Sequence, residues 1–174
     1  MLASSSINLK EKIVILDRDG VINYDSVHYI RSPEEWMPIS GSLEAIARLN
    51  HAGFRVAVAT NQSGIGRGYY TEAILEAIHQ KMHQALQSKG GKIDFIAYCP
   101  HLPSDQCACR KPQPGLLLQI AQHFQCNIVG VPFVGDNLSD VNAALAVNAF
   151  PLLIGKEWSN LEQIVDAILS VVIT

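Results

Sequence analysis

The sequence feature that most constrains this chain is a short apolar run that leads directly into two aspartates. Residues Ile13 to Leu16 are all aliphatic, and Asp17, Asp19 and Gly20 follow them closely. A continuous run of this kind is typical of a strand covered on both faces, as in a parallel sheet between layers of helices. Ligands of such sheets bind just beyond the carboxyl ends of the strands, which is where the two aspartates fall.

The spacing of the two aspartates favours a cation site. Residues i and i+2 of an extended chain point to the same side, so Asp17 and Asp19 converge on one small volume. Their mutual repulsion calls for a cation, most simply Mg²⁺, which prefers oxygen ligands. Taken alone, the same residues could also form an ordinary turn after a strand.

Further apolar stretches predict strands that alternate with stretches of helical periodicity. The predicted strands cover residues 54–59, 95–98, 129–134 and 150–154, and the predicted helices cover residues 41–52, 71–88, 114–125, 138–147 and 159–169. This alternation predicts a parallel sheet with right-handed crossovers and helices on both faces. Because the 174 residues contain no repeat or linker, we expect a single three-layer, doubly wound α/β domain over residues 1–174. The polar residues 1–10 are expected to be loosely held.

Composition and charge limit the classes of protein. Hydrophobic residues make up 48% and charged residues 17% of the chain, which is ordinary for a globular protein. The net charge of −3 gives no basic field for nucleic acid, and no apolar run approaches the ~20 residues of a membrane span. The N-terminus lacks the pattern of a secretory signal, so we expect a cytoplasmic protein, a monomer that binds neither nucleic acid nor membranes. Its four cysteines are then expected to be free or metal-bound rather than paired in disulfides.

Polar side chains also follow the later predicted strands at or near their carboxyl ends. Besides the two aspartates, these segments carry Thr60, Asn61, Gln62, Ser63, Arg110, Lys111, Asp136 and Asp140. Because the carboxyl ends of parallel strands share one edge of the sheet, these groups could form a site for Mg²⁺ and a phosphate. Several of them have an ordinary alternative: Thr60 could cap a helix or form a turn, Lys111 could be solvated, Arg110 could be a surface arginine, and Asp136 could cap the following helix.

The order of these groups resembles the four motifs of the haloacid dehalogenase superfamily of phosphohydrolases, over nearly the whole chain. The matching residues are Asp17 with Asp19, then Thr60, Lys111 and Asp136. The resemblance implies a phosphoric monoester hydrolase in which Asp17 is phosphorylated and Asp19 acts first as general acid and then as general base. It also implies that Asp17, Asp136 and the backbone oxygen of Asp19 hold a catalytic Mg²⁺.

The resemblance gives the remaining motif residues supporting roles. Thr60 would donate a hydrogen bond to a phosphoryl oxygen, and the ammonium of Lys111 would offset negative charge on Asp17 and on the phosphate. Asp140 lies one helical turn beyond Asp136, where it could orient Asp136 or a metal-bound water, or simply face solvent.

A second cluster combines three cysteines and a histidine within eleven residues. Cys99, His101, Cys107 and Cys109 suit a closed tetrahedral site, in which Zn²⁺ would be structural because no position stays open to water. The alternatives are a disulfide between Cys107 and Cys109, or free thiols beside a stray histidine. Cys126 has apolar neighbours and is expected to be a small core residue.

The gaps between the motifs leave no room for an inserted cap domain, so we expect a capless fold with an open site. Such a fold with a zinc loop resembles a subgroup of sugar bisphosphate phosphatases related to histidinol-phosphate phosphatases. This resemblance implies a small phosphorylated sugar of lipopolysaccharide biosynthesis as substrate, bound by Asp25, Asn61, Gln62, Ser63 and Arg110. Asn137 stands where the family often has a lysine, which leaves the exact sugar and its anomer open.

Three other functions share part of this pattern. Histidinol phosphate is the alternative substrate, although no acidic or aromatic residues that would bind its imidazole and ammonium groups are evident. A zinc-binding interaction module without activity would not need the intact acids, threonine and lysine. A polynucleotide 3′-phosphatase shares the motifs, but the acidic net charge and the lack of a basic stripe count against it.

Overall fold

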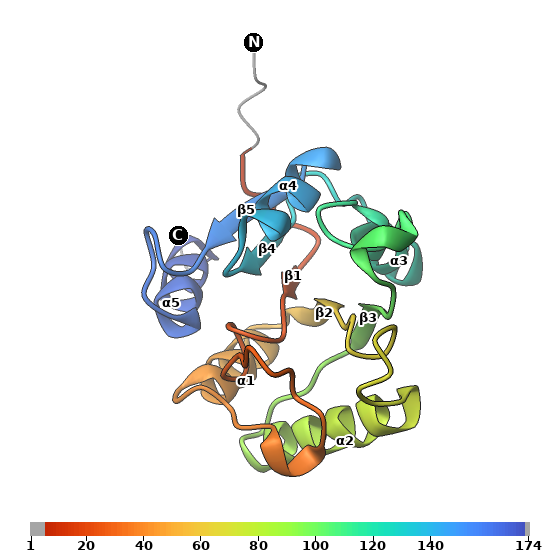
Figure 1. Cartoon of the computed structure of the whole chain (residues 1–174). Helices are drawn as coiled ribbons and strands as arrows, with labels where there is room; N and C mark the ends of the chain where they lie inside the picture. The colour runs from red at the N-terminus through yellow and green to blue at the C-terminus, as the bar shows by residue number, and fades with distance from the viewer. Residues whose placement is uncertain (1–5, 173–174) are drawn as a thin grey trace.

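The five-stranded sheet that the sequence predicts is present, and its strands are parallel. The structure is a computed structural model that describes residues 6–172. Its strands are β1 (Ile13–Leu16), β2 (Arg55–Asn61), β3 (Phe95–Cys99), β4 (Pro132–Gly135) and β5 (Phe150–Leu153). Their order in the sheet is β3-β2-β1-β4-β5, so β1 lies at the centre (Figure 1).

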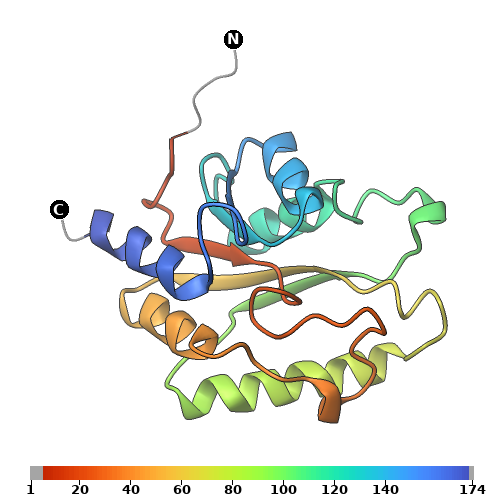
Figure 2. The ribbon, with the colours of Figure 1, turned by 60° about the vertical axis from the view of Figure 1, so that its left-hand side comes forward.

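Within residues 6–172, five α-helices cover the two faces of the sheet. They are α1 (Ser42–His51), α2 (Glu72–Ser88), α3 (Gly115–Phe124), α4 (Leu138–Ala146) and α5 (Leu161–Val172). Helices α1, α2 and α5 contribute to the apolar cluster on one face, and α3 and α4 to the cluster on the other, which makes three layers (Figure 2). None of the helices described combines the length and the hydropathy that crossing a membrane would require.

Strand β1 shows why both faces of the sheet need a cover. Its side chains alternate between the faces, so Val14 and Leu16 join the cluster with α1 and α5, while Ile13 and Ile15 join the cluster with α3 and α4. All four side chains are fully buried. Burial of an aliphatic side chain of this size stabilises a fold by about 1.5–3 kcal/mol. The run that opens the sequence is therefore the centre of the core.

The strand order places the two acidic loops side by side. After β3 the chain crosses back over the sheet to β4, which pairs with β1. The backbone N–H of Asp17 donates to the carbonyl of Val134 at 2.8 Å, so the ends of β1 and β4 are hydrogen-bonded together. A reversal of strand order of this kind is where open α/β sheets bind their ligands.

The long loop of residues 21–40 is anchored at its base. The ammonium of Lys81, on α2, donates to the carbonyls of Pro33 and Trp36 at 2.6 and 3.0 Å. A short 3-10 turn, η1 (Pro33–Glu35), lies between these contacts, and a second one, η2 (Pro103–Asp105), lies in the cysteine-rich loop. The loop therefore brings residues 25–30 to the carboxyl edge of the sheet without an α-helix of its own.

The predicted strands and helices are confirmed to within three residues at their ends, but two local expectations are wrong. Strand β4 begins at Pro132 rather than at residue 129, because Gly130 turns the chain there with a φ of +75°. The N-terminal segment is not loosely held from residue 7 onward: Ile7 and Leu9 pack against the core, and the N–H of Asn8 donates to Gly130 at 2.7 Å. Residues 1–5 lie outside the described part of the chain.

Candidate active site

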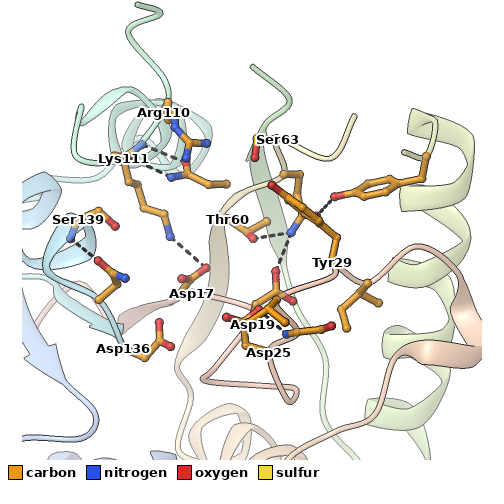
Figure 3. A pocket seen from close by; sticks show the side chains of 17 residues that line it. Asp17, Asp19, Asp25, Tyr29, Thr60, Ser63, Arg110, Lys111, Asp136 and Ser139 are labelled. Atoms are coloured by element: carbon orange, nitrogen blue, oxygen red, sulfur yellow. Dashed lines mark hydrogen bonds and ion pairs between the residues drawn. The ribbon is translucent and has the colours of Figure 1, made fainter. Parts of the chain in front are cut away.

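A pocket of about 370 Å³ opens at the carboxyl edge of the sheet, and every residue predicted for the phosphate site lines it except Asp140, which is buried behind it. Its lining includes Asp17, Asp19, Asp25, Thr60, Asn61, Gln62, Ser63, Arg110, Lys111 and Asp136. Loops that are distant in the sequence thus bring their polar side chains together, as Figure 3 shows for most of them. A pocket of this size suits a small ligand.

Lys111 and Asp17 form a buried ion pair at the base of the pocket. The ammonium of Lys111 lies 3.0 Å from an oxygen of Asp17 and 2.7 Å from an oxygen of Asp140, and it donates to the carbonyl of Ala59 at 2.8 Å. Burial raises the pKa of the Asp17 carboxyl to about 7, although the charge of Lys111 acts in the opposite direction. Burial alone would lower the pKa of Lys111, but Asp17 and Asp140 raise it, so the lysine keeps its charge.

Asn61 holds Lys111 in place. This residue ends β2, and its side chain donates to the carbonyl of Lys111 at 3.1 Å and accepts from the N–H of Lys111 at 3.0 Å. The reciprocal pair satisfies both backbone groups of a residue in an otherwise irregular loop. Asn61 therefore lines the pocket as predicted, but its amide is already engaged with the backbone.

Three carboxylates form a cluster beside the lysine. Oxygens of Asp17, Asp136 and Asp140 all lie within 4.8 Å of one another. Burial, together with the charges of Asp140 and Asp25, raises the pKa of Asp136 to about 6. Gly20 permits the close approach, because a Cβ at that position would clash with the carboxylate of Asp136. A crowded set of oxygen ligands, buried at Asp140 and open to solvent at Asp136, fits a hard divalent cation such as Mg²⁺.

Asp19 turns away from this cluster and is held by a separate set of donors. Its carboxylate accepts hydrogen bonds from Arg18 at 2.8 Å, from Asn23 at 2.8 Å and from Gln62 at 3.0 Å. Burial alone would raise the pKa of Asp19, but the charge of Arg18 and these hydrogen bonds lower it. Asp17 and Asp19 therefore lie in different environments, although only one residue separates them in the sequence.

Thr60 lies at the same end of the sheet, fully enclosed by its neighbours. It is 1% exposed, and its hydroxyl accepts from the amide of Gln62 at 2.9 Å. The carbonyl oxygen of the same Gln62 side chain, Oε1, accepts from the hydroxyl of Tyr70 at 2.6 Å. Gln62 thus connects Thr60, Asp19 and Tyr70 rather than presenting a free amide to the pocket.

The outer part of the pocket is formed by Arg110, Ser63 and the tip of the loop that carries Asp25. Arg110 has a buried guanidinium nitrogen, Nη1, with no hydrogen-bond partner among the described residues. A buried donor of this kind is costly unless a ligand pairs with it. In Figure 3, Arg110 and Asp25 lie on opposite sides of the pocket, with Asp17 and Thr60 between them.

The four predicted zinc ligands come together beyond the end of β3. The sulfur of Cys99 lies 3.5 Å from that of Cys107, the sulfur of Cys109 lies 3.5 Å from that of Cys107, and Nδ1 of His101 lies 3.2 Å from the sulfur of Cys109. Ligand atoms around a tetrahedral zinc are separated by roughly 3.3–3.8 Å, given bond lengths near 2.0–2.3 Å. The kinds of donor and most of these separations fit Zn²⁺, although the sulfurs of Cys99 and Cys109 lie closer together, at 2.8 Å.

A backbone contact supports the same metal site. The N–H of Arg110 points to the sulfur of Cys107 at 3.4 Å. Burial would raise the pKa of Cys107, but this N–H and the neighbouring thiols lower it to about 6, which favours its thiolate, whereas burial raises the pKa values of Cys99 and Cys109. The cysteines Cys99, Cys107, Cys109 and Cys126 are free rather than disulfide-bonded. Cys126 packs beside the core cluster, as expected.

Sequence reasoning missed several residues that support the site. Asn137, not Asp136, caps α4, since its side chain accepts from the N–H of Ser139 at 3.1 Å. For Asp140 the sequence left a supporting role and solvent exposure both open, and the structure shows it buried and paired with Lys111. Arg18, which pairs with Asp19, could have been suspected because an arginine at the end of a buried strand needs a partner.

The comparisons with known proteins agree with this geometry. A family model described as polynucleotide kinase 3 phosphatase matches residues 12–150. The chain is 56% identical over 154 residues to the D-glycero-beta-D-manno-heptose-1,7-bisphosphate 7-phosphatase of Pseudomonas putida. The matched region covers 87% of this chain and 88% of that relative.

Solved structures show the same fold. The crystal structure of D,D-heptose 1,7-bisphosphate phosphatase from B. bronchiseptica, complexed with magnesium and phosphate, has a TM-score of 0.86 and 43% identity, covering 91% of this chain and 98% of that one. A HAD-like phosphatase from Mesorhizobium loti has a TM-score of 0.77 and 27% identity, covering 98% and 90% of the two chains.

Fold, site and comparisons together define the class: this chain is a phosphohydrolase of the haloacid dehalogenase superfamily. Within that superfamily it belongs to the family of the D-glycero-β-D-manno-heptose 1,7-bisphosphate 7-phosphatases. The expected capless α/β fold is thereby confirmed.

Proposed function

We propose that this protein removes the 7-phosphate of D-glycero-D-manno-heptose 1,7-bisphosphate through a phosphoaspartate intermediate on Asp17. The observation that carries the proposal is the arrangement at the base of the pocket. There a desolvated carboxylate, Asp17, is paired with Lys111 at 3.0 Å and grouped with Asp136 and Asp140. The names of the relatives supply the substrate.

In the first half of the reaction, Asp17 acts as nucleophile and Asp19 as general acid. An oxygen of Asp17 forms a bond to phosphorus while the bond from phosphorus to the sugar oxygen breaks. Asp19 gives that oxygen its proton, so the product leaves as an alcohol. The negative charge of a bound phosphate favours the protonated form of Asp19 that this step needs.

In the second half, water attacks the phosphorus of the phosphoaspartate. Asp19, now a carboxylate, takes a proton from the water as the bond between Asp17 and phosphorus breaks, which releases inorganic phosphate and restores both residues. The hydrogen bonds that lower the pKa of Asp19 favour the form that accepts this proton. Thr60 and Lys111 would donate to the phosphoryl oxygens, where negative charge accumulates.

Both metals have fitting ligand sets. Asp17 and Asp136, with the backbone oxygen of Asp19 and with Asp140 close by, would hold Mg²⁺. When bound, Mg²⁺ neutralises the phosphoryl oxygens and so makes attack by a carboxylate easier. Zn²⁺ bound by the Cys99–Cys109 loop would have a structural role, because all four positions are filled by protein ligands.

Residues at the rim of the pocket would bind the rest of the substrate. The unpaired guanidinium nitrogen of Arg110 suits the second phosphate or the sugar hydroxyls. Asp25 and Ser63 would contact the sugar, while Asn61 and Gln62 shape the pocket through the contacts described above. We further propose that residues 1–174 act as one domain, as a cytoplasmic monomer, in the synthesis of the heptose of lipopolysaccharide.

The test compares two substrates under the same conditions with Mg²⁺ present. Release of phosphate from D-glycero-D-manno-heptose 1,7-bisphosphate should exceed release from histidinol phosphate by about 100-fold or more in kcat/KM, a gap that needs roughly 2.7 kcal/mol of differential transition-state binding. A preference for histidinol phosphate would overturn the choice of substrate. The variant Asp17→Asn controls for a contaminating phosphatase.

A further inference from the structure

A buried arginine behind the pocket links Asp19 to helix α2. Arg18 is completely buried, and its Nη2 reaches the two oxygens of Asp19 at 2.8 and 3.2 Å while its Nε reaches one of them at 3.1 Å. Several hydrogen bonds from one planar group fix both the position and the plane of a carboxylate. The orientation of Asp19 therefore depends on the orientation of the guanidinium.

The remaining nitrogen of that guanidinium contacts His79. Nη1 of Arg18 lies 3.3 Å from Nε2 of His79, which is 4% exposed and lies in the middle of α2. Burial, and then the charge of Arg18, lower the pKa of His79 to about 3. The ring is therefore neutral, and its Nε2 accepts the hydrogen bond that Arg18 donates.

His79 is well placed to fix the guanidinium because it belongs to a rigid element. Its neighbours on the same face of α2, Leu75, Ile78 and Met82, are fully or almost fully buried in the core. His79 itself does not line the substrate pocket. A buried N–H that loses its acceptor is costly, so without His79 the guanidinium would turn to find another partner.

We propose that His79 is a positioning residue that orients the Asp19 carboxylate through Arg18. The proposal rests on the proposed function, because Asp19 is the general acid only in that mechanism. General acids contribute about 10²–10⁴-fold to a rate when they are well placed. Gln62 independently donates to Oδ2 of Asp19 at 3.0 Å. Loss of His79 should therefore cost part of the rate enhancement from Asp19 rather than all of it.

The leaving group distinguishes positioning from a merely structural role. The sugar oxygen of heptose 1,7-bisphosphate is a poor leaving group and needs the proton from Asp19, whereas p-nitrophenolate leaves without one. The ratio kcat/KM covers the steps up to formation of the phosphoaspartate, in which Asp19 acts as acid. A displaced Asp19 should therefore slow the sugar substrate selectively.

The experiment measures kcat/KM of the full-length protein on heptose 1,7-bisphosphate and on p-nitrophenyl phosphate. His79→Leu, which removes the acceptor, should lower the value by about 10-fold or more on the sugar and by less than about 3-fold on the aryl ester. His79→Gln, which keeps an acceptor, should recover most of the loss. Ile78→Val removes volume from the same helix without touching Arg18, so it should leave the ratio of the two values unchanged.

Two outcomes would overturn the proposal: equal losses on both substrates, or no loss on the sugar. If His79→Leu does not fold, Arg18→Lys serves instead, since an ammonium cannot make the planar contact and must give the same selective loss. Asp19→Asn provides the benchmark for complete loss of the acid. If that variant shows no selectivity for the aryl ester, the proposed mechanism itself fails, whereas a failure confined to His79 and Arg18 leaves it standing.

Discussion

At the scale of single residues, Lys111 is the contact on which the base of the pocket depends. Its side chain is 2% exposed and lies between the carboxylates of Asp17 and Asp140. The loop that carries it is fixed by Asn61. Because all three charged groups are shielded from water, removing the cation would leave two buried carboxylates without compensation.

The variant Lys111→Met should therefore lose both stability and activity. Breaking a buried ion pair costs about 3–5 kcal/mol, and loss of an electrostatic donor lowers kcat by about 10²–10³-fold. Urea unfolding and phosphate release measure the two effects. Lys156→Met changes an exposed lysine and should shift the free energy of unfolding by less than about 0.5 kcal/mol. Wild-type stability in Lys111→Met would show that the pair has no such role.

The carboxylate cluster also predicts how stability depends on pH and Mg²⁺. In the folded protein the pKa of Asp17 is raised to about 7 and that of Asp136 to about 6, from ordinary values of 3.8. Between these limits the folded chain binds more protons than the unfolded chain, so these two groups make stability fall as pH rises toward 7. Mg²⁺ competes with the protons and should relieve this loss.

The rise in Tm on adding Mg²⁺ should consequently be larger near pH ~8 than near pH ~5. A hundredfold excess over the dissociation constant stabilises by about 2.7 kcal/mol, or roughly 5–10 °C for a chain of this length. Thermal unfolding followed by circular dichroism gives the values, with Asp136→Asn as the control that should lose most of the rise. An equal rise at both pH values would contradict the assignment of the cluster.

Individual residues were predictable where their type and place left few options. Asp17 and Asp136 directly follow apolar strands, and such ends gather at one edge of a parallel sheet, whereas Lys111 lies in the long loop after β3 and was predicted from the family resemblance. The cap role of Asn137 and the burial of Asp140 were not predictable, because both depend on how the loop after β4 turns toward Lys111. Side-chain contacts across elements have no signal in sequence spacing.

At the scale of elements, the cysteine-rich loop between β3 and α3 carries both the candidate zinc ligands and two residues that line the pocket. Cys107 and Cys109 precede Arg110 and Lys111 directly in the sequence. The N–H of Arg110 donates to the sulfur of Cys107 at 3.4 Å. Metal binding at this loop would therefore also fix the residues that face the pocket.

Cys107→Ser should lower zinc content and thermal stability together, because an incomplete ligand set binds zinc more weakly. We expect a loss of about 2 kcal/mol or more in the free energy of unfolding, with less than one zinc per chain by elemental analysis. Cys126→Ser is the matched control, since Cys126 lies outside the cluster and should keep its zinc. Full zinc occupancy in Cys107→Ser would refute the ligand assignment.

Helix α2 shows what element-level patterns can and cannot reveal. Its periodicity predicts the helix, and the same periodicity places His79 on the buried face with Leu75, Met82 and Leu86. A histidine on an apolar face needs a partner, but the sequence does not say that the partner is Arg18. The pairing appears only when α2 packs beneath the end of β1.

At the scale of the whole molecule, the strand order explains why one small pocket receives so many polar groups. The chain leaves β1 toward β2 and β3 and then returns to β4, so four loops meet above the central strand (Figure 1). Loops therefore form the rim of the pocket. The size of the pocket limits how large a substrate the site can enclose.

The size and charge of the molecule argue against polynucleotides as the main substrate, although the matching family model bears a polynucleotide phosphatase name. The net charge is −3, and nucleic-acid affinity depends on cations along the backbone. We expect kcat/KM on a 3′-phosphorylated oligonucleotide to be at least ~100-fold below that on heptose 1,7-bisphosphate, a difference of about 2.7 kcal/mol. Comparable kcat/KM values on the two substrates would contradict this expectation, because they would require a row of basic side chains along the nucleic-acid path, which the net charge does not suggest.

The covalent intermediate on Asp17 can be observed most directly by rapid acid quenching during turnover, followed by peptide mass spectrometry. The mechanism predicts one phosphoryl group on the peptide of residues 13–19, assigned to Asp17, and none on the same peptide from Asp17→Asn. A wild-type enzyme that turns over with the phosphoryl group on another residue would contradict it, and so would one in which Asp17→Asn retains turnover.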